Sequence, residues 1–229
     1  MSEGEVVRLG FIGCGSHARL TLYPQIHRIA ELDLVAVCDL NESRRTKAKR
    51  DFGARYDYAD YRTMCDEQDL DAVCIVGPPA MQYEIGMEIV KDYRLPIFLE
   101  KPPALTYAQA LELAQTAEEA GVWGMTAFMK RFAPAYATAE RICRSEEFGR
   151  VTMVDLRYTH GPYPLIWGLS PEPYCCLVGN SCHIFDLARF FGGDVAEVYA
   201  RLWYPGSGGS FAFAVTVAFV NGAVGVINC

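Results

Sequence analysis

The first half of the chain alternates short apolar runs with segments of helical periodicity. The apolar run from Val6 to Ile12 ends in glycines, and a helix-like segment from Ala18 to about Ile29 leads into a second run from Leu32 to Cys38. The same alternation continues through further strand-like runs (Ala72 to Val76, Ile97 to Leu99, Trp123 to Phe128) and helix-like segments (Glu42 to Phe52, Met81 to Asp92, Tyr107 to Ala120). Several runs are almost continuously apolar, which is typical of parallel strands covered on both faces. The pattern predicts an α/β domain with a doubly wound parallel sheet of the Rossmann type.

The pattern changes after Phe128. A helix-like segment from Ala135 to Arg144 precedes an alternating segment from Val151 to Tyr158, and a second helix is expected from Ser181 to Phe191. Three long strands are expected at the end, and Asn221-Gly222 is a hairpin signal between the last two: Val195 to Tyr204, Phe211 to Val220 and Ala223 to Ile227. We therefore predict the Rossmann-type domain over residues 1–125 and an α+β domain with a mostly antiparallel sheet over residues 126–229.

The last residue, Cys229, falls inside an expected strand. Complete domains usually cover an apolar strand with a free edge, because such an edge promotes aggregation. We expect that the second domain is truncated, and the alternative is that this strand pairs within a dimer.

Composition narrows the range of partners and compartments. The net charge of −7 gives no general attraction for nucleic acid or for an anionic membrane surface, so neither is expected as a partner. The nine cysteines are scattered through apolar stretches without CxxC pairs or ligand spacing, which favours reduced thiols and no metal site. The acidic residues before Val7 are unlike a signal peptide, and we expect a cytoplasmic protein.

The first strand leads into a glycine motif of the type that binds dinucleotides. Gly13-Cys14-Gly15-Ser16-His17-Ala18 is a GxGxxA sequence between an expected strand and helix. Gly13 permits a tight turn, Gly15 lets the backbone approach a pyrophosphate, and Ala18 keeps the helix close to the strand. The alternative is a glycine turn without a ligand. His17 is expected to be solvent-exposed or next to a phosphate rather than catalytic.

The second strand ends at Asp39, where an acidic side chain can accept hydrogen bonds from both hydroxyls of the adenosine ribose. A carboxylate at this position repels a 2′-phosphate, so NAD is favoured over NADP. NADP remains the alternative because Arg44 and Arg45 follow closely and could partly compensate a phosphate charge. Alternatively, the two arginines are solvent-exposed residues at the start of a helix.

Two later motifs make the chain similar to a known family. Val76-Gly77-Pro78-Pro79 follows one expected strand and Glu100-Lys101-Pro102 follows the next, and with the glycine motif they resemble the Gfo/Idh/MocA oxidoreductases. The similarity continues through further segments: Phe128 to Phe132, Phe148 to Val151 and His183 to Arg189. The resemblance implies an N-terminal Rossmann domain and a C-terminal domain whose open sheet is often used for dimer or tetramer assembly. Most members are longer than this chain.

The resemblance also implies a set of site residues. The lysine of the Glu-Lys-Pro motif, here Lys101, reaches the substrate beside the nicotinamide, and the histidine matching His183 commonly contacts the substrate. The expected cofactor-binding residues lie in the loops after successive strands: Gly13, Gly15, Ser16, His17, Ala18, Asp39, Arg44, Pro78, Glu100 and Lys101.

Lys101 and His183 are the candidate catalytic residues, because oxidation of an alcohol needs a group that removes the hydroxyl proton as hydride leaves. Lys101 follows an apolar strand at the carboxyl edge of the sheet, where its ammonium could stabilise an alkoxide; otherwise it is a surface lysine paired with Glu100. His183 is expected in the first turn of its helix, where the dipole favours a neutral base. Its alternative role is structural, in a polar stripe with Asp186 and Arg189.

One position departs from the family pattern. Many polyol dehydrogenases of the family carry an aspartate four residues before this histidine, whereas the chain has Gly179, followed by Asn180. The usual proton relay is therefore incomplete. Nearby aromatic and imidazole side chains could contact a sugar or pack on their own sheet: Tyr158, His160, Tyr163, Trp167 and Tyr174. Lys130 and Arg131 could lie near the cofactor or form ion pairs between domains.

Taken together, these features predict an NAD(P)-dependent oxidoreductase that acts on a CH–OH group of a sugar, inositol or related polyol. A variant of this reaction uses transient oxidation and tightly held NAD to cleave a glycosidic bond. The competing hypothesis is a non-catalytic dinucleotide-binding regulator or assembly subunit, favoured by Gly179 and the short chain. A homo-oligomer formed through the C-terminal sheet is expected.

Overall fold

The protein is described by a computed structural model that covers residues 6–206 and 209–229. The chain divides into two compact units, Met1–Ala127 and Phe128–Cys229. Each unit contains its own sheet and its own buried core, so the two are described separately.

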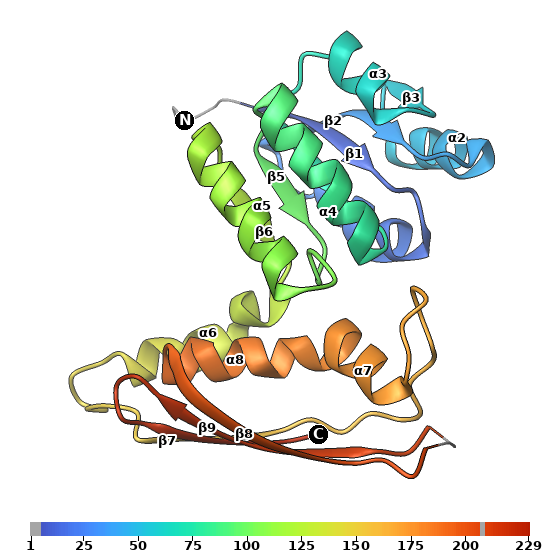
Figure 1. The fold of residues 1–229 in the computed structure, drawn as a ribbon. Coiled ribbons are helices and arrows are strands. Elements are labelled where there is room, and N and C mark those ends of the chain that lie inside the picture. The colour runs from blue at the N-terminus through green and yellow to red at the C-terminus, as the bar shows by residue number, and fades with distance from the viewer. Residues whose placement is uncertain (1–5, 207–208) are drawn as a thin grey trace. The chain divides into compact units, whose positions relative to one another are not determined.

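The first unit is built on a six-stranded parallel sheet with the order β3-β2-β1-β4-β5-β6 (Figure 1). Its strands are β1 (Val7–Ile12), β2 (Leu32–Cys38), β3 (Tyr56–Tyr58), β4 (Ala72–Ile75), β5 (Ile97–Leu99) and β6 (Gly124–Thr126). The strand order reverses between β1 and β4, and ligands of such sheets bind outside the carboxyl ends of the strands at this switch point. This arrangement confirms the predicted doubly wound sheet.

Helices cover both faces of this sheet. They are η1 (Ala18–Leu22) with α1 (Tyr23–Ile26), α2 (Glu42–Phe52), α3 (Tyr61–Glu67), α4 (Pro79–Glu88) with η2 (Ile89–Tyr93), and α5 (Tyr107–Ala120). Side chains alternate along β1, so Phe11 joins a core with α1 and α2, whereas Ile12 joins a core with α3, α4 and α5. The sheet is thus buried on both sides, and only its edges and strand ends can offer a site.

The second unit has a four-stranded sheet with the order β7-β10-β9-β8. Its strands are β7 (Met153–Arg157), β8 (Val195–Trp203), β9 (Ala212–Phe219) and β10 (Val224–Asn228). The pairs β8–β9 and β9–β10 are antiparallel and β7–β10 is parallel, which confirms the prediction of a mostly antiparallel sheet. The helices α6 (Pro134–Cys143), α7 (Glu172–Cys176) and α8 (Cys182–Gly192) lie on one side of it (Figure 1).

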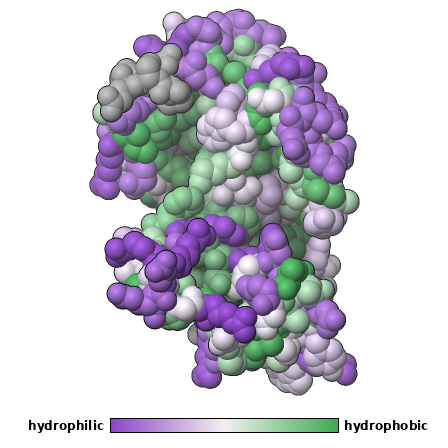
Figure 2. All heavy atoms as spheres, turned by 90° about the vertical axis from the view of Figure 1, so that its left-hand side faces the viewer, coloured by the Kyte–Doolittle hydropathy of each residue, from purple (hydrophilic) through white to green (hydrophobic). Residues whose placement is uncertain are grey.

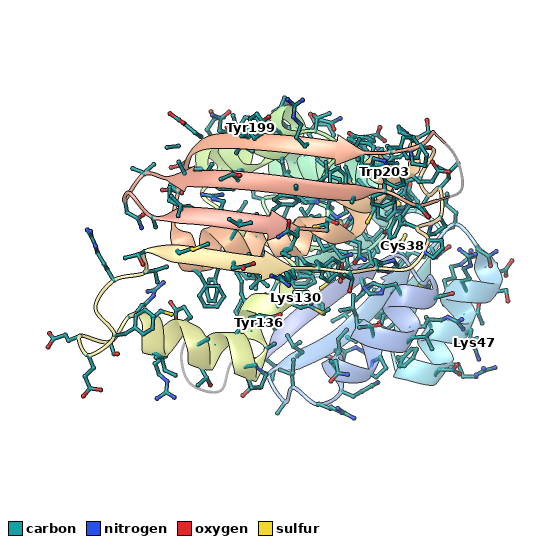
Figure 3. All side chains as sticks on the ribbon, turned by 90° about the horizontal axis from the view of Figure 1, so that it is seen from below. Cys38, Lys47, Lys130, Tyr136, Tyr199 and Trp203 are labelled. Atoms are coloured by element: carbon teal, nitrogen blue, oxygen red, sulfur yellow. The ribbon has the colours of Figure 1, made fainter. Side chains whose placement is uncertain are left out.

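The opposite face of this sheet carries no helix in the described residues. Val215 and Val217 of β9 point toward α8, where they pack with Ile184 and Ala188. Because side chains alternate along a strand, the residues between them and their partners on neighbouring strands point to the bare face. Tyr199 and Trp203 of β8 are among them, and both are labelled in Figure 3, which views the sheet from this side.

Hydrophilic residues make up much of the surface visible in Figure 2, with hydrophobic residues in smaller patches. Among the described helices, none is long and apolar enough to cross a membrane.

Candidate active-site residues in the two units

The glycine turn after β1 is tight on one side and open on the other. Gly13 has φ +103°, and a Cβ on it would lie 2.0 Å from the carbonyl oxygen of Val76, so no other residue fits there. A Cβ on Gly15 would meet nothing within 4 Å. The Cys14 side chain is fully buried against Tyr23 rather than filling the turn. The turn therefore leaves room above Gly15 for the pyrophosphate that the motif predicts.

Asp39 lies directly beside this turn, just past the end of β2. Its Oδ2 accepts a hydrogen bond from the backbone N–H of Cys14 at 2.8 Å, and its Oδ1 accepts one from the N–H of Asn41 at 2.8 Å. The side chain is only partly buried, and each carboxylate oxygen can accept a second hydrogen bond. The carboxylate is thus held in one orientation and can still accept ribose hydroxyls.

The two arginines of α2 are placed differently. Arg45 donates to the carbonyl oxygen of Asp39 at 3.4 Å, and its Nε lies 3.6 Å from Oδ2 of Asp57. Arg44 is exposed, and its backbone N–H is capped by the side chain of Asn41. Of the two cations that could compensate a 2′-phosphate, one is therefore already engaged with a carboxylate.

The buried carboxylate of Glu100 joins the glycine turn to the loop after β5. His17 Nε2 lies 3.0 Å from Glu100 Oε1, and the backbone N–H of Lys101 donates to Glu100 Oε2 at 3.0 Å. His17 is largely exposed, as predicted, but it contacts Glu100 and so links two loops of the site. Ser16 is exposed in the same turn and Ala18 is fully buried against the core, in agreement with the packing role expected for that position.

Gln82 is a residue of this region that the sequence analysis did not identify. It lies in α4, one turn after Pro78, and its side chain is fully buried. Its Nε2 donates to the carbonyl oxygen of Pro102 at 3.1 Å and so fixes the loop that carries Lys101. A glutamine within an otherwise apolar helix face was the available signal, because a buried amide needs a partner.

His183 is placed differently from the prediction. Helix α8 agrees with the expected helix Ser181–Phe191 to within one residue at each end. Helical structure begins earlier, however, because α7 starts at Glu172 and continues through a π-helical turn, η4 (Leu177–Ser181), into α8. His183 is therefore inside a continuous helical segment, and the argument from the helix dipole does not apply. The imidazole is buried and meets the ring of Phe128 edge-on at 6.0 Å.

Asp186 and Arg189, the two charged residues of the suggested polar stripe, form ion pairs with residues outside it. Asp186 accepts three hydrogen bonds from Nε and Nη2 of Arg131 at 2.7 to 3.0 Å, and Arg189 pairs with Asp194. Arg131 and Asp186 belong to the same unit, so Arg131 forms its ion pair there and not with another domain. Lys130 lies over the ring of Tyr158 at 5.6 Å, and Figure 3 labels it.

Gly179 lies in the π-helical turn and is buried. A Cβ at this position would lie 2.5 Å from the hydroxyl oxygen of Tyr163 and 3.2 Å from side-chain atoms of Ile166 and Trp167. The neighbouring Asn180 accepts a hydrogen bond from the hydroxyl of Tyr158 at 3.0 Å through its Oδ1. The aromatic loop is thus packed against this turn, and an aspartate at position 179 would have no room without its displacement.

Comparison with known proteins identifies the class. Residues 7–128 match the model of the oxidoreductase family with an NAD-binding Rossmann fold, and residues 136–229 match the GFO/IDH/MocA C-terminal domain. The chain belongs to the Gfo/Idh/MocA oxidoreductase family, and NAD is the cofactor of its Rossmann fold. The open turn at Gly15 and the anchored carboxylate of Asp39 fit this cofactor.

Individual relatives agree with this class. The chain is 28% identical over 230 residues to "Uncharacterized oxidoreductase YrbE" of Bacillus subtilis (strain 168), covering 96% of this chain and 65% of the relative. It is 26% identical over 196 residues to "Inositol 2-dehydrogenase/D-chiro-inositol 3-dehydrogenase" of Lactiplantibacillus plantarum, covering 85% of this chain and 55% of the relative. The crystal structure of a dehydrogenase from Chromobacterium violaceum has a TM-score of 0.89 at 22% identity, with 98% of this chain and 65% of that chain covered. The chain thus spans less than two thirds of the length of these relatives.

Proposed function

We propose that the protein is an NAD-dependent dehydrogenase or reductase that transfers hydride to or from a CH–OH carbon of an inositol, sugar or related polyol. The observation that carries this proposal is the pairing of an open glycine turn at Gly15 with the Asp39 carboxylate, which is held beside it by the Cys14 N–H. The relatives named as inositol dehydrogenases support the substrate class. NAD is preferred over NADP because the carboxylate repels a 2′-phosphate and Arg45 is already paired with Asp57.

The proposed roles of the chain's own residues follow from their chemistry. Lys101 holds the substrate oxygen and stabilises its negative charge while the proton is removed. His183 accepts that proton or passes it to solvent. NAD+, when bound, supplies the hydride acceptor. Glu100 and Gln82 keep the Lys101 loop in place through the Lys101 N–H and the Pro102 carbonyl.

Replacement of Lys101 by alanine tests this function. We expect Lys101→Ala to lower kcat/KM for a polyol at least a hundredfold, because the charge that stabilises the alkoxide is lost, while NADH fluorescence titration gives an unchanged Kd. Lys91→Ala, a substitution in η2, is the matched control and should leave both quantities unchanged. Failure of NADH to bind to the folded wild-type protein would exclude hydride transfer altogether.

A non-catalytic dinucleotide-binding subunit is the second candidate, and Gly179 is the observation that favours it, because the position lacks an acidic side chain. The same experiment separates the two, since a regulator would bind NADH but show no turnover that depends on Lys101.

We also propose that the protein forms a homo-oligomer through the bare face of the β8-β9-β10-β7 sheet. Its exposed Tyr199 and Trp203 support this proposal.

We further propose a reducing, cytoplasmic environment. The nine cysteines, all of which are free thiols, support this proposal.

A further inference from the structure

The π-helical turn before His183 is in contact with a phenol hydroxyl. Gly179 lies four residues before His183, about one helical turn away, so positions 179 and 183 lie on the same side of the helical segment. The hydroxyl oxygen of Tyr163 is 2.5 Å from the point that a Cβ of residue 179 would occupy. Tyr163 comes from the loop between β7 and α7. Its hydroxyl therefore takes the place where a side chain from position 179 would start.

The surroundings hold the Tyr163 ring in this place. The ring of His160 meets it edge-on at 5.3 Å, and Ile166 and Trp167 pack against the same turn. π-Helical turns are rare and often occur at functional sites, because the extra residue redirects side chains and backbone groups.

The charged groups of this part of the unit are largely neutralised. Asp186, the acidic residue on the same helix as His183, accepts hydrogen bonds from Nε and Nη2 of Arg131. Glu172 at the start of α7 accepts a hydrogen bond from Tyr204. The polar group closest to the missing side chain at 179 is thus a neutral phenol. Burial raises the pKa of Tyr163 to about 12, so the phenol keeps its proton near neutral pH and can donate a hydrogen bond.

We propose that Tyr163 is a substrate-orienting residue, whose hydroxyl donates a hydrogen bond to a substrate hydroxyl next to the one that His183 serves. This inference rests on the proposed polyol oxidoreductase function and names a group of the substrate site that contacts the ligand. A neutral donor takes the role that an acidic side chain at position 179 could otherwise have. Proton removal stays with His183 and Lys101.

The first experiment is Tyr163→Phe, which removes the hydroxyl and keeps the ring. We expect kcat/KM for a polyol such as myo-inositol to fall about tenfold or more, the size of one lost hydrogen bond to substrate, with the Kd for NADH unchanged. Tyr136→Phe, in α6, is the matched control because its ring packs on Phe191, at a different part of the unit. It should behave as the wild type.

A double-mutant cycle tests the geometry. Gly179→Ala should push the Tyr163 hydroxyl away and lower kcat/KM on its own, but it should add little to Tyr163→Phe, because the displaced atom is then already absent. Thermal unfolding of each variant checks that it is folded.

The outcomes separate this inference from the function on which it rests. If the wild type oxidises a polyol and Tyr163→Phe does so equally well, the role of Tyr163 is wrong while the proposed function stands. Additive effects of Gly179→Ala and Tyr163→Phe would also overturn it, because the two positions would then act independently. If NADH binds but no polyol is turned over, both the proposed function and this inference fail.

Discussion

At the scale of single residues, the proposed cofactor site depends on backbone groups more than on side chains. Gly13 fits because Val76 leaves no space for a Cβ, and Asp39 is oriented by two backbone N–H groups. These roles could be predicted from the sequence because each follows from one residue type at one spacing. Gln82 and Tyr163 could not, because their partners, the Pro102 carbonyl and the turn at Gly179, are distant in the sequence.

Asp39→Asn tests the proposed role of Asp39 in selecting the cofactor. The amide cannot accept from both Cys14 and Asn41, and it carries no negative charge toward the ribose. We expect the Kd for NADH to rise about tenfold or more, and the ratio of NADPH to NADH affinity to increase because the repulsion of the 2′-phosphate is lost. Asp33 lies on β2 and pairs with Arg55, and Asp33→Asn is the control. Fluorescence titrations with both nucleotides measure the effect, and unchanged NADH binding would contradict the role of Asp39.

At the scale of elements, the helices with clear end signals were the most predictable. Helix α5 agrees with the prediction at both ends, where Thr106 and Gln109 form a capping box and Gly121 adopts a left-handed conformation. Helix α7 was missed because Pro171, Pro173 and Gly179 are typical of a loop, and the helix forms from tertiary packing instead. Strand β3 and helix α3 were missed because both are short and polar at the surface.

Two glycine-to-alanine changes in helices should have opposite effects on stability. A Cβ on Gly192, at the end of α8, would lie 2.3 Å from the Phe219 ring of β9, whereas a Cβ on Gly86 in α4 has its nearest neighbour at 3.5 Å. We expect Gly192→Ala to lower the free energy of unfolding by about 1–3 kcal/mol through overpacking. Gly86→Ala should raise it by about 0.5–1 kcal/mol because alanine favours the helix.

Urea denaturation of both variants measures these changes. Equal effects of the two substitutions would show that helix propensity, rather than the close approach of α8 to the sheet, decides the stability at position 192.

At the scale of the whole molecule, the surroundings of an exposed aromatic side chain indicate whether it could lie in a contact between subunits. Trp203 of β8 and Trp123 before β6 are both 61% exposed, and they differ in their surroundings. Trp203 lies on the bare face of an open sheet, on the same face of β8 as Tyr199 and Arg201. An exposed sheet face that carries aromatic side chains and no helix in the described residues is typical of a surface that a second chain covers.

Trp203→Glu should therefore dissociate the proposed homo-oligomer, because a carboxylate placed in an apolar contact loses its hydration without gaining a partner. Trp123→Glu introduces the same charge at an equally exposed tryptophan of the other unit and should leave the assembly unchanged. Sedimentation velocity at several protein concentrations distinguishes the two, and circular dichroism verifies that both variants are folded. A wild type that sediments as a monomer at every concentration, or a Trp203→Glu variant that assembles like the wild type, would show that this face of the sheet is not the contact between subunits.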